Sequence, residues 1–229
     1  MNAAAEDLAP FLAPTPCIDS AHAAIVAFAR EATAGAHTPR DVAIRLYYAV
    51  RDGIRYDPYA IELSVDGLGA RRTLERGRGF CITKAALLAA AARALGIPAR
   101  VGYADVKNHL STARMREMMG TDEFYWHGYT SLRLEGRWVK ATPAFNIELC
   151  EKFRIRPLEF DGTDDSIYHP YDLDGRQHME YLRYRGEYAD VPVAAIVEDF
   201  ARHYPRMTAL ITEGDFDREV ARETAGYGS

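Results

Sequence analysis

The stretch RGRGFCITKAALLAAAARALGIPAR, residues 76–100, decides the predicted fold. It places Cys81 after a glycine-rich turn and directly before an alanine-rich run. That run ends at Gly96, with Pro98 beyond it, which are the usual signals of a helix end. We therefore predict a helix over residues 81–95 whose small side chains let it pack closely on a sheet. Cysteine is also one of the most buried residue types, so the position alone leaves open whether Cys81 reacts or only packs.

A cysteine at a helix N-terminus meets unpaired backbone N–H groups and the positive end of the helix dipole. Both favour the thiolate, so the sequence predicts a lowered pKa for the Cys81 thiol. The same N–H groups would stabilise an oxyanion on a carbonyl that the sulfur attacks. Lys84, one turn further along, is expected to be solvated. Cys17 and Cys150 lack this setting and are interpreted as structural.

The composition is that of an ordinary globular protein. The chain has 229 residues, 48% of them hydrophobic and 27% charged, with a formal net charge of −5. It has no lysine–arginine cluster, which argues against a nucleic-acid surface, and its longest apolar run is too short to cross a membrane. The N-terminus does not resemble a secretory signal, and three widely spaced cysteines fit neither a disulfide framework nor a zinc site. We expect a cytoplasmic protein with free thiols, no metal and no cofactor, and leave its oligomeric state open.

A second stretch, EFYWHGYTSLRLEGRWVKATPAF at residues 123–145, is typical of two strands joined by a tight turn at Glu135-Gly136. His127 lies on the first strand, 46 residues after Cys81. A strand histidine has few degrees of freedom and can stay opposite a thiol. A Cys–His pair of this kind is the minimal apparatus for covalent acyl chemistry, although a single histidine is more often an ordinary hydrogen-bonded residue.

The predicted strand register identifies which residues could orient the imidazole. With a two-residue turn, His127 lies opposite Ala144, and Thr142 and Asn146 are its diagonal neighbours within side-chain reach. The choice between Thr142 and Asn146 stays open. Three aromatic residues near the pair are candidate substrate-binding residues, although aromatic side chains in strands more often belong to the core: Tyr56, Trp126 and Tyr129.

Together the two stretches resemble the transglutaminase-like superfamily, in its bacterial type, over residues 54–146. The shared features are the Gly-x-Cys helix start, the helix exit Arg-Ala-Leu-Gly-Ile-Pro-Ala-Arg, the strand histidine and a following Trp-Val. The resemblance implies an α+β, papain-like fold in which a cysteine-bearing helix packs on an antiparallel sheet. It also implies that Cys81 is the nucleophile and His127 the general base. Where the family has aspartate before proline, this chain has Thr142, which can orient a ring but supplies no charge, and Asn146 is the alternative.

We expect one domain over residues 1–229, with a core at about 39–146 and a C-terminal extension at about 147–229. Further helices are predicted over residues 20–34, with Ser20 as the cap, 39–50, and 193–203. Short strands are predicted at residues 54–56 and 98–106. Residues 157–190 are rich in Asp, Tyr, Gly and Pro and predict an irregular segment that shapes the cleft.

By this resemblance the chain is a cofactor-free cysteine enzyme that acts on amide, peptide or related acyl bonds of a peptide, a protein or a small molecule. Hydrolysis is favoured over crosslinking because calcium-free, bacterial-type relatives commonly hydrolyse. The alternative is a protein-binding module that kept the fold and lost the chemistry, which Thr142 favours. A redox or metal site at Cys81 and His127 is disfavoured because no further ligand has suitable spacing.

Overall fold

The protein is described here from a computed structural model, which defines residues 6–59, 61–108, 112–167, 173–175, 179–206 and 215–225. Its elements, in chain order, are η1 (Ala9–Phe11), α1 (Ala23–Ala32), α2 (Pro39–Gly53), β1 (Arg55–Tyr56), α3 (Ala70–Arg76), β2 (Arg78–Gly79), α4 (Cys81–Ala94), β3 (Ala99–Asn108), α5 (Ala113–Met119), β4 (Glu123–Leu134), β5 (Arg137–Ala141), α6 (Ile147–Phe153), β6 (Met179–Tyr188), α7 (Val193–His203) and α9 (Phe216–Thr224). This content confirms the predicted α+β class.

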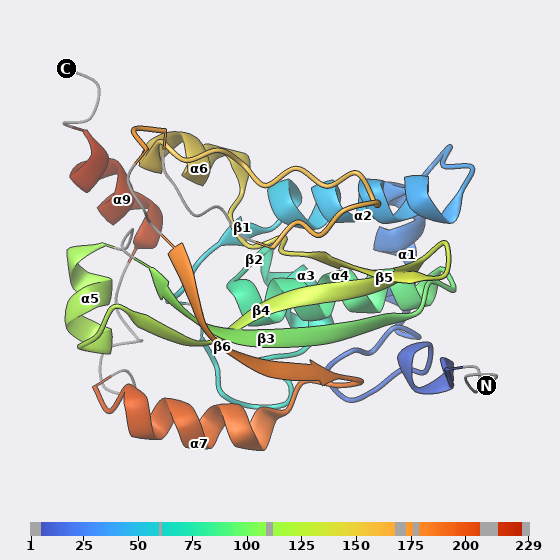
Figure 1. Ribbon diagram of the computed structural model, residues 1–229, viewed down its shortest axis with the longest axis horizontal. Helices are drawn as coiled ribbons and strands as arrows, with labels where there is room; N and C mark the ends of the chain where they lie inside the picture. Colours follow the sequence, from blue (N-terminus) through green and yellow to red (C-terminus); the bar gives the residue numbers. More distant parts are fainter. Residues whose placement is uncertain are drawn as a thin grey trace.

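An antiparallel sheet of four strands, in the order β5-β4-β3-β6, forms the centre of the molecule (Figure 1). A separate parallel pair, β1 and β2, sets Tyr56 beside Gly79 just before α4 begins. Helices α1 to α4 gather on one side of the sheet, and α7 runs below the edge formed by β6 in this view (Figure 1). The chain segment that carries Cys81 therefore enters α4 directly from a strand, which restricts its position.

Helix α4 is the core helix. All twelve of its residues from Ile82 to Arg93 are buried, because α1, α2 and α3 pack on part of its surface and β3 and β4 pack on the rest. A helix that is apolar on every side must be covered on every side. The run of alanines allows this close approach, and the Thr130 hydroxyl of β4 donates to the Ala85 carbonyl at 2.8 Å.

The β4–β5 hairpin has the predicted register. Leu134 pairs with Arg137 and Thr130 with Ala141. The two loop residues, Glu135 and Gly136, have φ angles of 48° and 79°, as a two-residue hairpin turn of this hand requires. The predicted pairing of His127 with Ala144 is wrong, however, because β5 ends at Ala141 and its last partner in β4 is Thr130.

The helix starts confirm one predicted cap and correct another. Thr38 caps α2, its hydroxyl oxygen accepting from the Asp41 N–H at 3.1 Å. The predicted cap of the first helix, Ser20, is wrong, because His22 holds this place and its Nδ1 accepts from the Ala24 N–H at 3.3 Å. Ser20 is instead buried.

The prediction of an irregular segment at residues 157–190 is wrong in part, because β6 forms the edge of the main sheet beside β3. Two register shifts interrupt the β3–β6 pairing, and charged and apolar residues do not alternate cleanly along β6, so the sequence carries only a weak strand signal. Four short helices were not predicted either: α3, α5, α6 and α9. Helix α7 has the predicted bounds, 193–203.

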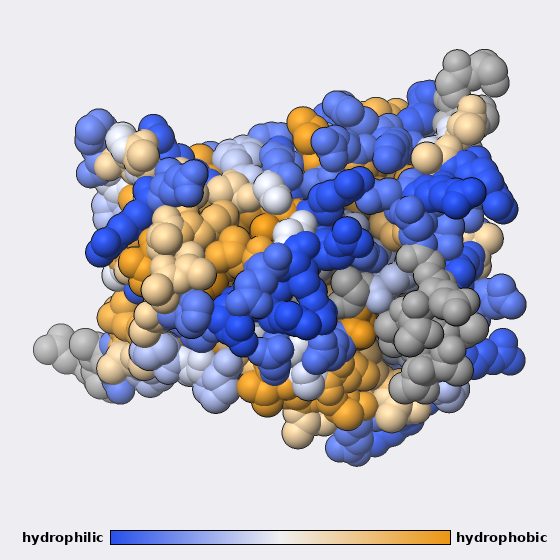
Figure 2. Space-filling model, turned by 180° about the vertical axis from the view of Figure 1, so that it is seen from behind, coloured by the Kyte–Doolittle hydropathy of each residue, from blue (hydrophilic) through white to orange (hydrophobic). Residues whose placement is uncertain are grey.

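On the face turned away from the view of Figure 1, hydrophilic side chains surround separate apolar areas (Figure 2). In the described part of the chain, every helix is too short or too polar to span a membrane.

Candidate active site

The entry into α4 fixes the Cys81 backbone. Gly77, with φ of 63°, ends α3 in the left-handed conformation that glycine adopts without strain. At Gly79 a Cβ atom would come within 2.3 Å of the Thr83 hydroxyl, so only glycine fits there. That hydroxyl accepts from the Phe80 N–H at 3.1 Å and satisfies one donor of the helix start. Cys81 is the first residue of the helix, as predicted.

The strand that carries His127 lies against this helix start. Gly128 is the contact point, since a Cβ atom there would lie 2.9 Å from the Cα of Ile82 and 3.0 Å from the Cys81 carbonyl oxygen. Real side chains do not approach backbone so closely. The absence of a side chain at Gly128 therefore lets β4 bring His127 to the beginning of α4.

Cys81 and His127 line one pocket. Its walls come from β1 and the loop after it, from α5, from β4 and from α7, and they are almost wholly apolar or aromatic: Tyr56, Pro58, Ile61, Phe80, Ile82, Met115, Met119, Phe124, Tyr125, Phe200 and Tyr204. Cys81 keeps partial exposure to solvent and His127 is buried. The pocket therefore suits an uncharged group next to a thiol and an imidazole.

Both groups of the pair are neutral at pH 7 in this enclosed setting. Burial raises the pKa of the Cys81 thiol from 9.0 to about 11, against the lowering effect of hydrogen bonds from the backbone N–H groups of Gly128, Ile82 and Cys81 itself. Burial lowers the pKa of His127 from 6.5 to about 4. The predicted lowered pKa of the thiol is therefore wrong for the unliganded protein, because desolvation outweighs the helix terminus.

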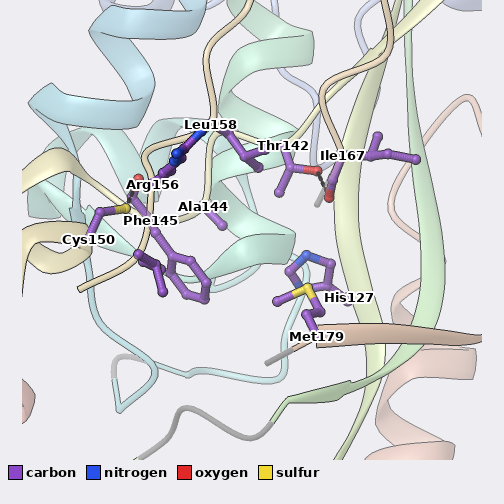
Figure 3. Close-up of a pocket in the computed structure, with 10 residues that line it drawn as sticks. His127, Thr142, Ala144, Phe145, Cys150, Arg156, Leu158, Ile167 and Met179 are labelled. Atoms are coloured by element: carbon purple, nitrogen blue, oxygen red, sulfur yellow. Dashed lines mark hydrogen bonds between the residues drawn. The ribbon is translucent and has the colours of Figure 1, made fainter. Parts of the chain in front are cut away.

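Thr142 and Asn146, the two candidates for orienting the imidazole, lie in different places. Thr142 lines a second pocket together with His127, and the two face each other across it (Figure 3). The Thr142 hydroxyl, however, donates to the Ile167 carbonyl at 3.1 Å. Among the described residues, Nε2 of His127 has no hydrogen-bond partner. The position where the family pattern places an acid thus holds a hydroxyl that is already engaged.

Asn146 is turned away from the imidazole. Its side-chain oxygen accepts from the Tyr56 N–H at 3.1 Å, and its amide donates to Glu148 at 3.2 Å. It also precedes α6 as the N-cap residue. The structure brings Thr142 and not Asn146 to the pocket of His127, while Asn146 ties β1 to the segment after β5.

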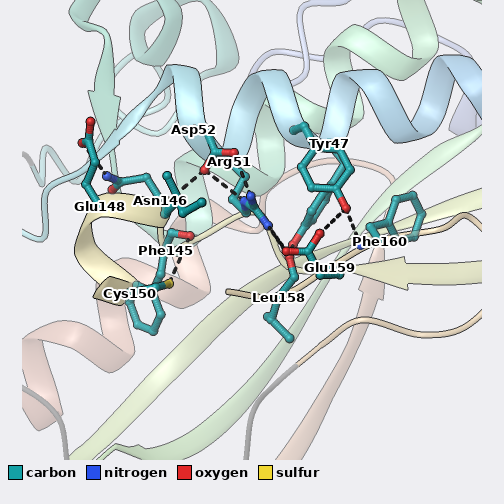
Figure 4. A network of polar contacts seen from close by, with 12 residues as sticks. Tyr47, Arg51, Asp52, Phe145, Asn146, Glu148, Cys150, Leu158, Glu159 and Phe160 are labelled. Atoms are coloured by element: carbon teal, nitrogen blue, oxygen red, sulfur yellow. Dashed lines mark hydrogen bonds and ion pairs between the residues drawn. The ribbon is translucent and has the colours of Figure 1, made fainter. Parts of the chain in front are cut away.

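A polar network anchored on α2 holds the Thr142 segment in place (Figure 4). The Tyr47 hydroxyl donates to the Leu158 carbonyl at 2.8 Å and lies 3.3 Å from the Thr142 carbonyl. Arg51 donates to the same Leu158 carbonyl at 2.6 Å and to Asp52 at 2.8 Å. These bonds fasten two connecting segments on the far side of His127.

Lys84 is not solvated, contrary to the prediction. It is fully buried, and its Nζ donates to three backbone carbonyls, those of Arg51 at 2.9 Å, Ile54 at 2.6 Å and Ala144 at 2.7 Å. The three acceptors match the three N–H groups of the Lys84 ammonium. Burial opposes the charged form and lowers the pKa of Lys84 to about 7. Lys84 thus joins α4 to the end of α2, the start of β1 and the segment after β5.

The three predicted substrate-binding residues lie in different surroundings. Tyr56 lines the pocket of Cys81 and His127. Trp126 does not line it; the ring is buried and its indole N–H donates to Asp199 at 2.9 Å. Tyr129 is buried as well, with its ring over Gly102 and its hydroxyl 3.2 Å from Glu187. Of the three, Tyr56 is the one that lines this pocket.

The sequence matches the transglutaminase-like superfamily over residues 26–143, more than half of the chain. The chain belongs to this superfamily. No curated protein matches it. Membership supports a cysteine-type enzyme, and the match ends at Thr142 and its following proline, so the later strand and helices lie beyond it.

Two solved structures are similar to this transglutaminase-like chain. One is named "Putative Cysteine Protease", from Cytophaga hutchinsonii, with a TM-score of 0.52 and 18% sequence identity over 86% of this chain and 52% of that one. The chain therefore spans about half of that protein. The other is named a "putative protease", from Parabacteroides distasonis ATCC 8503, with a TM-score of 0.37 and 16% identity over 52% of this chain and 22% of that one. The first likeness shows the shared fold.

Sequence reasoning missed several residues of the transglutaminase-like site. Gly128 follows the predicted histidine, but its role depends on contact with α4 and leaves no local signal. Met115 and Met119 of α5 and Phe200 and Tyr204 of α7 line the pocket from helices remote in sequence. An apolar face on the predicted helix over residues 193–203 was the one available sign. Within the described residues, no group of three or more His, Cys, Asp or Glu could hold a metal ion.

Proposed function

We propose that the chain is a cysteine-dependent acyl-transfer enzyme in which Cys81 attacks the carbonyl carbon of an amide, peptide or related acyl bond. The observation that carries this proposal is the shared pocket of Cys81 and His127, with backbone N–H groups around the sulfur. The family membership is consistent with it. A packed core does not require a thiol and an imidazole to line the same pocket.

The resting pair is neutral, so thiol deprotonation and attack must be coupled. As the Cys81 sulfur bonds to the carbonyl carbon, His127 takes the thiol proton and then gives it to the leaving amine. A thioester and a free amine result. Water then attacks the thioester with His127 as base, which releases a carboxylic acid and restores the thiol.

The tetrahedral intermediate carries an oxyanion that needs donors. The N–H groups of Cys81, Ile82 and Gly128, whose influence lowers the pKa of the thiol, are the candidates for this role. Fixed backbone donors need no reorganisation during the reaction and stabilise an oxyanion more strongly in an apolar site than in water. Gly128 then has two functions, since it also allows the close contact between β4 and α4.

The pocket walls support an apolar or aromatic acyl group as the one that enters. A charged side chain would lose its hydration there without finding a counter-charge on the residues that line the pocket. We keep hydrolysis as the preferred outcome over transfer to an amine, by analogy with relatives. Thr142, which lines the second pocket with His127, is the candidate for orienting the imidazole, whereas Asn146 is hydrogen-bonded to Tyr56 and Glu148.

Trapping of the acyl-enzyme tests the proposal. The intact protein is mixed with p-nitrophenyl esters of an apolar and of a charged carboxylic acid, and its mass is recorded within the first turnover. We expect a single added acyl group on Cys81 with the apolar ester, none in Cys81→Ser, and slower addition in His127→Ala. Equal labelling of Cys17 or Cys150, or no difference between wild type and His127→Ala, would refute the enzyme. Added hydroxylamine reports how the thioester divides between water and an amine.

A binding module without chemistry is the second candidate, and one observation favours it. Nε2 of His127 is buried and has no partner within the described segments, while the Thr142 hydroxyl donates to the Ile167 carbonyl. A module would bind peptides equally well as wild type and as Cys81→Ala and would form no adduct with the esters. The same experiment therefore separates the two candidates.

A further inference from the structure

We propose that Arg185 of β6, together with Asp105 and Asp199, is a positioning group that holds a bulge in β4 and through it sets the place of His127. The proposal rests on the proposed function of His127 as the general base. Arg185 and Asp199 lie beyond the matched residues 26–143, so part of the positioning comes from the C-terminal extension.

The bulge lies immediately before His127. Ala104 pairs with His127 and Val106 with Phe124, so two residues of β4 stand opposite the single residue Asp105 of β3. In a regular strand, residues three apart point to opposite faces. Phe124 and His127 nevertheless line the same pocket. The extra residue in β4 accounts for this, so the bulge is what places the imidazole beside Cys81.

The bulge is unfavourable for the local chain. Trp126 has φ of 63°, a left-handed conformation that costs a bulky residue roughly 1–2 kcal/mol. Such a conformation persists only where the surroundings hold it. Contacts from other elements of the fold must therefore hold Trp126 in this conformation.

Two carboxylates hold the two N–H groups of Trp126. Asp105 accepts from its backbone N–H at 3.2 Å, and Asp199 of α7 accepts from its indole N–H at 2.9 Å. Arg185 bridges both carboxylates, donating to Asp105 through Nε and to Asp199 through Nη1, each at 2.5 Å. Its guanidinium also lies over the Trp126 ring, 4.6 Å from the centroid.

This cluster is well shielded from water. The side chains of Arg185, Asp105 and Asp199 are 10%, 6% and 15% exposed. Without the guanidinium, two carboxylates would share one enclosed site, and their repulsion would release one N–H of Trp126. The planar fork of arginine can bind both at once, whereas the single ammonium of lysine cannot keep the same geometry and stack on the ring.

Helix α7 reinforces the same stretch of β4. The Tyr204 hydroxyl accepts from the Tyr125 N–H at 2.7 Å and donates to the Glu123 carbonyl at 2.9 Å. The His203 ring stacks on Tyr125 with centroids 3.8 Å apart. Helix α7 and Tyr204, which follows it, therefore contact both residues of the bulge, Tyr125 and Trp126.

A double-mutant cycle on the full chain tests the proposal. The rate of Cys81 acylation by the apolar ester is measured in wild type, Arg185→Gln, His127→Ala and the double variant. Misplacing a catalytic group by about 1 Å can lower a rate on the order of 100-fold, so we expect Arg185→Gln to lose 10- to 100-fold. In the His127→Ala background it should lose no more than about twofold.

Arg100→Gln is the matched control. Arg100 also pairs with a glutamate of β6, Glu187, and lies 4.0 Å from the centroid of Trp138, but it lies on the far part of the sheet. It should lower the stability without changing the His127-dependent rate. If Arg185→Gln lowers the rate equally in both backgrounds, or Arg100→Gln lowers it as strongly, the positioning role is refuted. If Arg185→Gln does not fold, Asp199→Asn is judged by the same two criteria.

The ¹⁵N-edited NMR resonances of the His127 imidazole distinguish a failure of the positioning role from a failure of the proposed function. They report ring placement without any substrate, and His127→Ala assigns them. We expect Arg185→Gln to shift or multiply these resonances and Arg100→Gln to leave them unchanged. Shifted resonances without wild-type acylation would refute the enzyme but support the positioning. Unshifted resonances with normal acylation in Arg185→Gln would refute the positioning alone.

Discussion

At the scale of single residues, the reactivity of Cys81 depends on what surrounds it more than on its place at a helix N-terminus. Fixed N–H groups stabilise a thiolate, yet the apolar walls of the pocket raise the pKa of the thiol to about 11. His127 cannot compensate as an imidazolium, because its own pKa is lowered to about 4. In the proposed function the neutral pair must therefore transfer the thiol proton as the sulfur attacks.

Because the resting thiol is neutral, the rate at which iodoacetamide labels Cys81 should depend strongly on pH. We expect slow labelling near pH 6 and a rate that rises steadily up to about pH 10, since the thiolate is scarce below its pKa of about 11. The measurement is the rate of Cys81 carbamidomethylation by mass spectrometry across this range. A plateau already reached by pH 7 would contradict the neutral pair.

Thr142→Asp should favour the charged form of the Cys81–His127 pair, a thiolate beside an imidazolium. A carboxylate in the pocket with the unpartnered Nε2 of His127 would raise the pKa of the imidazole and favour proton transfer from Cys81. We expect labelling at pH 7 to accelerate about tenfold or more, which corresponds to a change in pKa of about one. Stability should fall, because the carboxylate meets the Ile167 carbonyl that now accepts from Thr142.

Thr142→Val is the control for this change. It has a similar shape but neither donates nor accepts, so it should leave the labelling rate at pH 7 close to that of the wild type. If Thr142→Asp labels no faster than Thr142→Val, Thr142 does not occupy the position of the family's acid.

At the scale of elements, the contact between β4 and α4 depends on Gly128. We expect Gly128→Ala to push the strand from the helix start, because its Cβ would lie 2.9 Å from Ile82, and to destabilise the protein by about 1–3 kcal/mol. Acylation of Cys81 should fall further than the stability does. Urea unfolding and ester acylation measure the two effects. Gly53→Ala is the control, because a Cβ atom at Gly53 would have no neighbour within 4 Å. It should change neither the rate of acylation nor the packing. If Gly53→Ala and Gly128→Ala lose the same acylation rate, the role of the contact at Gly128 is contradicted.

Lys84 is the point where several elements meet, and removing its charge should be costly. Lys84→Met leaves the carbonyls of Arg51, Ile54 and Ala144 without their donor inside the protein. Buried groups that lose a partner cost about 1–3 kcal/mol each, so we expect a loss of at least 2 kcal/mol in the free energy of unfolding. A variant as stable as the wild type would show that the carbonyls find other donors.

The elements that the sequence predicts well are those with local signals. Helix α4 ends at Ala94, just before Gly96 and Pro98, and the hairpin turns at Glu135-Gly136 because both residues must adopt positive φ. Strand β6 escapes prediction because its partner β3 lies about 80 residues earlier and its register shifts twice. The same limit applies to the site: Cys81 and His127 stand in readable motifs, whereas the bulge at Trp126 is held by groups from β3, β6 and α7.

At the scale of the whole molecule, the extension forms part of the central sheet and of the pocket that holds Cys81 and His127. Strand β6 completes the sheet beside β3, and α7 supplies Phe200 and Tyr204 to the pocket of Cys81. Deletion of residues 157–190 should therefore abolish folding and Cys81 acylation together, since it removes an edge strand and Arg185 with it. Circular dichroism and ester acylation measure this outcome. A folded, reactive deletion variant would restore the view of this segment as a surface cover.

Burial of His127 makes the stability of the whole protein depend on pH. The pKa of the imidazole is about 4 when folded and 6.5 when free, so between these values the unfolded chain binds a proton that the folded protein does not. Stability then rises with pH across this window, and acidification from 6.5 to 4 should remove about 3 kcal/mol. Carboxylates titrate in the same range, but they are shared by wild type and His127→Gln. The unfolding free energy of the wild type minus that of His127→Gln should therefore fall by about 3 kcal/mol as the pH falls from 6.5 to 4. Parallel curves from chemical unfolding at each pH would show that His127 is protonated, or reaches water, in the folded protein.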